Sequence, residues 1–192
     1  LFDKVILPRY EKSENTREPD DIDEKGTVII AGVGRFGQIV NRLLVTNGVK
    51  TVVLDHEVQQ VENLRKINTK SYYGDATQPD LLHTAGIEQA KMLVVAIDNP
   101  ERAVALVEYI KHTYPHVIVM ARAFDRRHLY RLRKAGADFM VSETFHSALN
   151  LGKHALIRLG VHPFKAEQQR ATFYETETTH KDTRYEAWKQ VT

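Results

Sequence analysis

The sequence predicts an α/β protein: a Rossmann-type, doubly wound parallel sheet of six strands, followed by a C-terminal helical dimerisation arm. Three observations carry this prediction. Short β-branched and apolar runs alternate with amphipathic segments, a glycine-rich turn follows the first run, and an acidic residue, Asp55, ends the second run. Strand and helix segments that alternate in this way favour a parallel sheet with helices on both faces.

The expected elements follow one another with short connections. The strands are expected at 27–31, 51–54, 70–73, 92–97, 117–121 and 139–141. The intervening helices are expected at 36–46, 57–67, 79–85, 100–113 and 125–135, and Gly136 is the expected stop of the last of these. A further helix is predicted over 143–159, with Ser142 as its N-cap.

Three regions of different character divide the chain. Residues 1–26 are interpreted as a linker because 11–26 are almost devoid of apolar side chains, and the opening at Leu1 suggests a piece of something larger. Residues 27–142 form the predicted nucleotide-binding domain, and 143–192 the helical arm and a polar tail. The aromatic residues of the tail leave two interpretations open, an arm that packs on a partner or a partly ordered tail: Phe164, Phe173, Tyr174, Tyr185 and Trp188.

Composition excludes several classes of protein. The 192 residues carry 27 Lys and Arg against 25 Asp and Glu, a net charge of +2 with mixed signs, so no nucleic-acid partner is expected. The absence of Cys excludes disulfides, thiolate metal sites and a cysteine nucleophile. No signal peptide opens the chain, and no apolar run reaches the about 18 to 20 residues that span a bilayer, so a soluble chain is predicted.

The glycine-rich turn has the form Gly-x-Gly-x-x-Gly and lies between a predicted strand and a predicted helix. Gly32 permits a tight turn, Gly34 lets a phosphate approach the backbone, and Gly37 lets helix and strand pack closely. The free N–H groups of the following helix then face an anion. This context predicts a phosphate-binding loop.

Acidic residues follow three of the predicted strands on the edge of the sheet that binds ligands. Asp55, eighteen residues beyond Gly37, is expected to accept hydrogen bonds from ribose hydroxyls and to repel a 2′-phosphate, which favours NAD or AMP over NADP. Asp75 could accept from an adenine amino group, cap residues 78–85, or do both. At Asp98 the sequence DNPE favours a helix cap over a ligand role. The candidate nucleotide-binding residues are Gly32, Val33, Gly34, Arg35, Phe36, Gly37, Asp55, His56, Asp75, Ala76 and Asp98.

The sequence indicates a binding protein and not an enzyme. Tyr130 and Lys134 have the Tyr-x-x-x-Lys spacing of short-chain dehydrogenases, but no Ser lies between Ser71 and Ser142 to complete that set, so both are interpreted as helix-surface residues. His112 and His116 have metal-ligand spacing, but the intervening Tyr-Pro should end the helix, so no metal site is predicted.

Arginines gather around the fifth strand and the helix after it. Arg127 and Arg131 form a like-charge i,i+4 pair, which is unfavourable unless an anion or an acidic partner lies nearby. The cluster comprises Arg122, Arg126, Arg127, Arg131 and Arg133. Together with Arg35 it indicates either a site for a ligand with carboxylates or a solvated basic face.

These motifs in combination resemble the KTN (RCK-type) regulatory domain of the bacterial glutathione-gated potassium efflux systems, the Kef family. The segments that carry the resemblance are VIIAGVGRFGQIVNRLL, VVLDHE, YYGDAT, IDNPE, ARAFDRRHLYRLRKAG and SETFHSAL. They cover about residues 27 to 160. Residues 1–26 are similar to the linker that follows the last membrane helix in that family.

The resemblance implies a homodimer on the cytoplasmic face of the bacterial inner membrane that binds an adenine nucleotide, AMP or NAD(H). It also implies glutathione as a regulatory ligand that keeps efflux closed, with S-conjugates opening it, and Arg35, Arg122 and Arg133 as candidate glutathione contacts. The implied partners are the membrane transport domain of the same polypeptide and an ancillary flavodoxin-like oxidoreductase.

Two other functions fit parts of the sequence. One is a regulator of potassium uptake or of a channel that responds to NAD(H) or ATP, and the other is an NAD-dependent oxidoreductase. The first would respond to nucleotide exchange and not to glutathione, and the second would turn over substrate with NADH.

Overall fold

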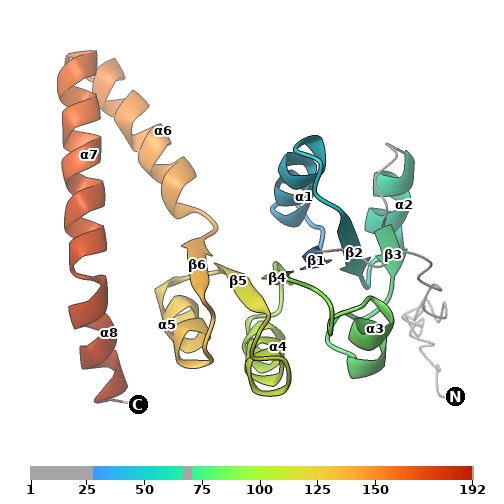
Figure 1. The fold of residues 1–192 in the computed structure, drawn as a ribbon. Helices are drawn as coiled ribbons and strands as arrows, with labels where there is room; N and C mark the ends of the chain where they lie inside the picture. Colours follow the sequence, from blue (N-terminus) through green and yellow to red (C-terminus); the bar gives the residue numbers. More distant parts are fainter. Residues whose placement is uncertain (1–27, 67–70, 192) are drawn as a thin grey trace, which may run out of the picture.

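The computed structural model describes residues 28–66 and 71–191. The predicted linker at 1–26, the first residue of the first predicted strand (Thr27), the end of the second predicted helix at Ile67 and the start of the third predicted strand at Lys70 lie outside these ranges. Figure 1 shows the two parts of the described chain, a sheet flanked by helices and a helical arm beside the last strand.

The sheet confirms the predicted Rossmann-type fold. Its six strands are all parallel and lie in the order β3-β2-β1-β4-β5-β6. The strands are β1 (Val28–Ala31), β2 (Thr51–Asp55), β3 (Ser71–Tyr73), β4 (Met92–Val95), β5 (Ile118–Ala123) and β6 (Phe139–Ser142). The order reverses between β1 and β4, which is where open sheets of this type bind ligands.

Helices cover both faces, because each helix that follows a strand packs back onto the sheet. The first five are α1 (Gly37–Thr46), α2 (Val58–Lys66), α3 (Pro79–Thr84), α4 (Pro100–Thr113) and α5 (Arg126–Lys134). Figure 1 shows α1 and α2 above the sheet and α3, α4 and α5 below it. The larger core lies on the lower face and contains Leu93, Val119 and Leu132, whereas a smaller core around Ile30 and Val53 lies under α1 and α2.

Beyond β6 the chain forms three more helices. They are α6 (Phe145–Arg158), α7 (Pro163–Thr179) and α8 (Lys181–Lys189). The helix predicted to start at 143 starts at Phe145 with Thr144 as N-cap, so the prediction of Ser142 as its cap is wrong: Ser142 is still part of β6. The polar tail is also helical, and α6 and α7 form a helical hairpin that rises beside the sheet (Figure 1).

The arm and the sheet domain differ sharply in burial. No residue of α6 is buried, and α7 and α8 bury only Ala166 and Tyr185. Tyr185 packs on α5, where its ring centroid lies 5.8 Å from that of Tyr130, and Trp188 completes the cluster at 5.6 Å from Tyr130. The interpretation of Tyr130 as a surface residue is therefore wrong, because α8 covers it.

Candidate functional site

The glycine loop has the geometry that its spacing predicts. Gly32 has φ +92°, and a Cβ there would lie 2.7 Å from the carbonyl oxygen of Ala96. A Cβ on Gly37 would lie 2.1 Å from the Gly32 carbonyl oxygen, so helix α1 can approach the loop only without a side chain there. A Cβ on Gly34 would meet nothing within 4 Å. The loop is thus tight where it touches the sheet and open where a ligand would approach.

Asp55 ties this loop to the second strand. One carboxylate oxygen accepts a hydrogen bond from the backbone N–H of Val33 at 2.7 Å, and the other accepts from the N–H of Glu57 at 2.8 Å. The side chain is only 8% exposed. Asp55 therefore closes a local turn onto Glu57 and also binds the glycine loop, and each carboxylate oxygen keeps a further lone pair.

Asp75 belongs to a second polar group in the same cleft. Its Oδ1 accepts from the N–H and the hydroxyl of Thr77, at 2.9 and 2.7 Å, and its Oδ2 accepts from Nη2 of Arg102. Burial alone would raise the pKa of Asp75, but the Thr77 hydrogen bonds and the Arg102 charge outweigh it and hold that pKa below its ordinary value. The residue that caps α3 is Gln78, so the expected cap at Asp75 is instead a turn onto Thr77.

The cleft between the ends of these strands brings together most of the predicted nucleotide-binding residues. Its lining comprises Gly32, Leu54, Asp55, His56, Asp75, Ala76, Thr77, Ile97, Asp98, Asn99 and Arg102. Helix α4 starts at Pro100, as predicted, but its cap is Asn99 and not Asp98: the Asn99 side chain accepts from the N–H of Arg102 at 2.9 Å, and Asp98 instead pairs with Arg122. Three carboxylates and one guanidinium therefore face a single cleft beside the glycine loop.

Arg122 joins this cleft to the start of the arm. Its guanidinium, with a side chain only 6% exposed, donates to the Ile97 carbonyl at 2.8 Å and pairs with Asp98 at 2.9 Å and with Glu143 at 3.4 Å. Its Nε is buried without a partner in the described chain. Arg35, at 93% exposure, reaches the same Glu143 at 3.9 Å. Of the predicted glutathione contacts, Arg122 and Arg35 thus meet around one carboxylate.

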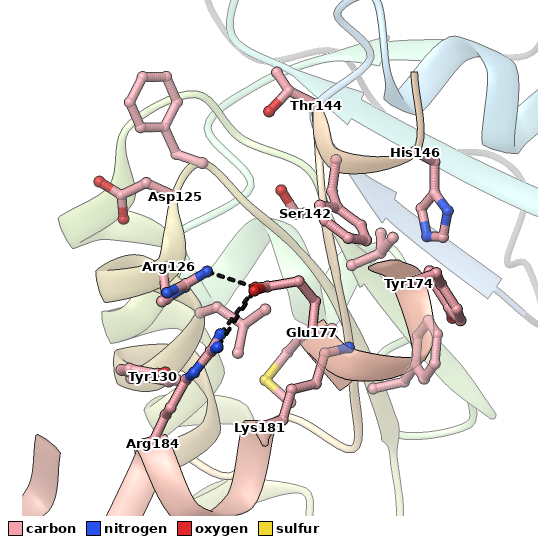
Figure 2. Close-up of a pocket in the computed structure, with 16 residues that line it drawn as sticks. Asp125, Arg126, Tyr130, Ser142, Thr144, His146, Tyr174, Glu177, Lys181 and Arg184 are labelled. Carbon is pink, nitrogen blue, oxygen red and sulfur yellow. Dashed lines mark hydrogen bonds and ion pairs between the residues drawn. The ribbon is translucent and has the colours of Figure 1, made fainter. Parts of the chain in front are cut away.

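A cavity of about 390 Å³ lies between the edge strand β6 and the arm. Figure 2 shows Arg126 of α5 and Arg184 of α8 both directed at Glu177 of α7. Each arginine approaches Oε2 of Glu177 to 2.8 Å. Hydrogen bonding to Arg184, helped by the charge of both arginines, outweighs desolvation and lowers the pKa of Glu177. Lys181 adds a third cationic side chain to the lining.

The arginine cluster has acidic partners from distant segments. Arg131 pairs with Glu101 at 3.1 Å. Arg133, the remaining predicted glutathione contact, pairs with Asp182 at 2.7 Å and lies 4.3 Å from the ring centroid of Tyr185. Much of the cluster therefore fastens α5 to α4 and to the arm. Sequence reasoning missed Arg102, Glu143 and Glu177, because residues far apart in the chain supply their partners.

The two histidines with metal-ligand spacing, His112 and His116, lie on different segments. Helix α4 ends at Thr113, as predicted, and His116 contacts the Glu88 carbonyl at 2.9 Å. Across 28–66 and 71–191 there is no group of three side chains suited to a metal ion. Within the same ranges, every helix is too short or too polar to cross a membrane.

Two family models match adjoining parts of the chain. The TrkA-N domain model matches residues 28–143, and the model of the potassium efflux system KefB C-terminal domain matches 147–192. Over 172 residues the chain is 49% identical to the glutathione-regulated potassium-efflux system protein KefC of Escherichia coli. That match covers 88% of this chain but 28% of KefC, so the chain spans less than a third of the relative's length.

Solved structures of related domains are also similar to this chain. The Kef CTD of Shewanella denitrificans in its AMP-bound form is 42% identical, with a TM-score of 0.76 over 84% of this chain and 98% of that one. GsuK bound to ADP is 30% identical, with a TM-score of 0.60 over 66% of this chain and 32% of that one. The similarity to the Shewanella protein extends beyond the sheet domain, which ends at β6, into the arm.

Proposed function

The chain belongs to the TrkA-N domain family, as a Kef-type KTN (RCK) domain, and on this premise we propose that it is the ligand-sensing regulatory part of a potassium efflux system with a bound adenine nucleotide. The observation that carries the proposal is the joining of the open glycine loop to Asp55 by the Val33 hydrogen bond. This contact supports the proposal because it holds the loop proposed to bind phosphate beside the carboxylate proposed to bind ribose.

The nucleotide is an adenosine phosphate without a 2′-phosphate. The cleft carries Asp55, Asp75 and Asp98 against one guanidinium, so a phosphate at the ribose end would be repelled. At the other end, the backbone at Gly34 is open and Arg35 is almost fully exposed, which suits a 5′-phosphate. AMP is bound to the Shewanella Kef relative, and this supports AMP over NAD(H) here.

Glutathione and its S-conjugates are the regulatory ligands in this proposal, as the name of the KefC relative suggests. Of the predicted contacts, Arg122 and Arg133 already have carboxylate partners, so they would bind a ligand only by exchanging them. The cavity beside β6 is the other candidate: Arg126 and Arg184 also have a carboxylate partner there, Glu177, but the cavity has a volume of about 390 Å³ and a third cation, Lys181. Arg126, Lys181 and Arg184 supply positive charge there, and apolar side chains such as Leu129 and Met140 line the walls.

A ligand carboxylate in this cavity would compete with Glu177 for the two arginines. Because Glu177 belongs to α7 and Arg184 to α8, whereas Arg126 belongs to α5, this exchange would change how the arm is held against the sheet domain. Glutathione and a bulkier conjugate would share the carboxylate contacts and differ in the room their sulfur substituents need. If glutathione and the conjugate prefer different arrangements of the arm, this difference in affinity would shift the equilibrium between a closed and an open state of the efflux system.

The functional unit in this proposal is a homodimer. On the face that carries α1 and α2, Ile118 of β5 and Phe139 of β6 remain 45% and 57% exposed. The arm carries exposed apolar side chains of its own, among them Leu151 and Phe173. A second copy brings both kinds of surface, so each chain could cover the exposed apolar groups of the other.

The remaining partners follow from the length of the relatives. The membrane transport domain would belong to the same polypeptide and lie at the inner membrane, with this domain on the cytoplasmic face. An ancillary flavodoxin-like oxidoreductase is a further proposed partner. In this role the domain binds ligands and transmits their presence, and it performs no catalysis.

Isothermal titration of the purified chain tests the proposal. Wild type should bind AMP saturably, and Asp55→Asn should weaken AMP binding about tenfold or more, because an NH2 donor replaces one of the two acceptor oxygens and the negative charge is lost. Glutathione and a bulky S-conjugate should both bind, and Arg184→Gln should weaken both. Arg65→Gln, on α2 away from both sites, is the matched control. Binding of NAD(H) or ATP with no response to glutathione would instead identify a nucleotide-gated regulator.

A further inference from the structure

The bond between Arg102 and Asp75 crosses the nucleotide cleft. Asp75 follows β3 and Arg102 lies in the first turn of α4, which follows β4. In the sheet these strands are separated by β2 and β1, so the pair joins segments that are not neighbours. The two side chains are 32% and 42% exposed and line the cleft. The contact therefore lies inside the cleft in which the nucleotide is proposed to bind.

The hydrogen bonds of Asp75 leave it with a defined remaining capacity. An ionised carboxylate offers about four lone-pair positions. The N–H and hydroxyl of Thr77 take two on Oδ1, and Arg102 takes one on Oδ2. Arg102 also donates to the Thr77 hydroxyl at 2.7 Å, so the three side chains form a closed set. One acceptor position, on Oδ2, is left.

From this arrangement we infer that Arg102 is a positioning residue that makes the cleft selective for 6-aminopurine over 6-oxopurine nucleotides. It orients Asp75 so that the last acceptor position faces the base. The amino group of adenine donates to that position, whereas hypoxanthine or guanine would place a carbonyl oxygen against a carboxylate. A site built to accept a hydrogen bond discriminates against a ligand that cannot donate one. The inference rests on the proposed adenine nucleotide.

Arg102 acts through Asp75 and is distinct from the phosphate-binding loop. Its backbone N–H is held by Asn99, so the first turn of α4 stays in place when the side chain is changed. Loss of the guanidinium would release Asp75 Oδ2 and the Thr77 hydroxyl, and the carboxylate could then rotate. The expected consequence is a loss of base selectivity beyond any loss of affinity shared by all nucleotides.

Titration of the full chain with AMP and with IMP tests the inference. Wild type should prefer AMP by about tenfold or more. Arg102→Met should lower AMP affinity about tenfold and reduce the AMP/IMP ratio to below about threefold, and Arg102→Lys should recover part of the ratio. Arg131→Met is the matched control, because Arg131 pairs with Glu101 outside the cleft lining and should keep the wild-type ratio.

The outcomes separate this inference from the proposed function. If wild type and Arg102→Met both bind AMP with the same AMP/IMP ratio, the positioning role is wrong and the nucleotide-binding function stands. If wild type binds neither nucleotide, the proposed function fails and the inference fails with it. Asp75→Asn serves as a second variant: it keeps the shape of the side chain and should lose the preference for AMP if Asp75 reads the base.

Discussion

The sheet domain and the helical arm are ordered by different means. Strands such as β1 and β4 are almost completely buried, and their order comes from apolar packing on both faces. In the arm, α6 buries nothing, and α7 and α8 are held by ion pairs and by the aromatic cluster of Tyr130, Tyr185 and Trp188. A single chain thus contains a sheet domain with its own apolar core and an arm that exposes apolar side chains such as Leu151 and Phe173.

The largest expected effect is on the free energy of unfolding, and it is tested by comparing one leucine of the sheet domain with one of the arm. Leu93 is fully buried in β4, whereas Leu151 of α6 is 73% exposed. Leu93→Ala should lower the free energy of unfolding by about 2 to 5 kcal/mol, because it removes core contacts and leaves a cavity. Leu151→Ala should change it by less than about 0.5 kcal/mol in dilute samples. Urea denaturation monitored by circular dichroism measures both.

The same two variants also test the proposed homodimer. If Leu151 is covered by a second copy, Leu151→Ala should raise the dimer dissociation constant in analytical ultracentrifugation, and its effect on unfolding should grow with protein concentration. Equal losses of stability in the two variants at high dilution would contradict the distinction between the regions.

An intermediate effect is expected where the arm meets the sheet domain. Tyr185→Ala removes the ring that packs on Tyr130 and lies beside Arg133. It should lower the free energy of local opening of α8 by about 2 kcal/mol, so amide exchange in that helix should be about thirtyfold faster. Exchange in β1 and β4 should stay as in wild type. Val191→Ala, at the exposed end of the chain, is the control, and unchanged exchange in α8 of Tyr185→Ala would show that the aromatic contacts do not hold it.

The smallest expected effect is a pH dependence confined to the sheet domain. His128 is buried, and burial, followed by the charge of Arg131, lowers its pKa below the usual 6.5, against an opposing influence of Asp125. Between the lowered pKa and 6.5 the unfolded chain binds a proton that the folded chain does not. Stability should therefore fall as the pH drops through that window.

Substitution of the histidine isolates this contribution. In wild type the Phe124 N–H donates a hydrogen bond to Nδ1 of His128 at 3.0 Å, and His128→Asn keeps an acceptor for it. This variant should flatten the dependence of the unfolding free energy on pH between 7 and 5. His154→Asn, an exposed residue of α6, should keep the wild-type slope. The role of His128 would be refuted by equal slopes in all three proteins.

The same contrast explains what the sequence could predict. The strands of the sheet are continuous apolar runs bounded by turn residues, so their positions were predictable to within about two residues, and the glycine spacing predicted the geometry of Gly32 and Gly37. The helices α7 and α8 were not predictable in this way, because their apolar residues do not form the single stripe along the helix that packing on a core requires.

The candidate site divides in a similar way. The residues of the cleft come from loops that follow predicted strands, so Asp55, Asp75 and Asp98 could be placed together from topology alone. The ion pairs of this region could not be predicted, because Arg102 and Glu143 have partners more than twenty residues away in the chain. Local patterns specify which strand end a residue follows, and tertiary packing decides which charge it meets.

The position of the arm has one further consequence, for aggregation. Strand β6 is an edge strand, with an outer row of backbone N–H and C=O groups that another sheet could pair with. The arm stands beside this edge, and residues of α7 and α8 share a cavity with β6 (Figure 1). A chain truncated after Ser142 would keep the six strands but would leave the outer edge of β6 uncovered. We therefore expect it to aggregate by pairing of β6 edges between molecules before it unfolds.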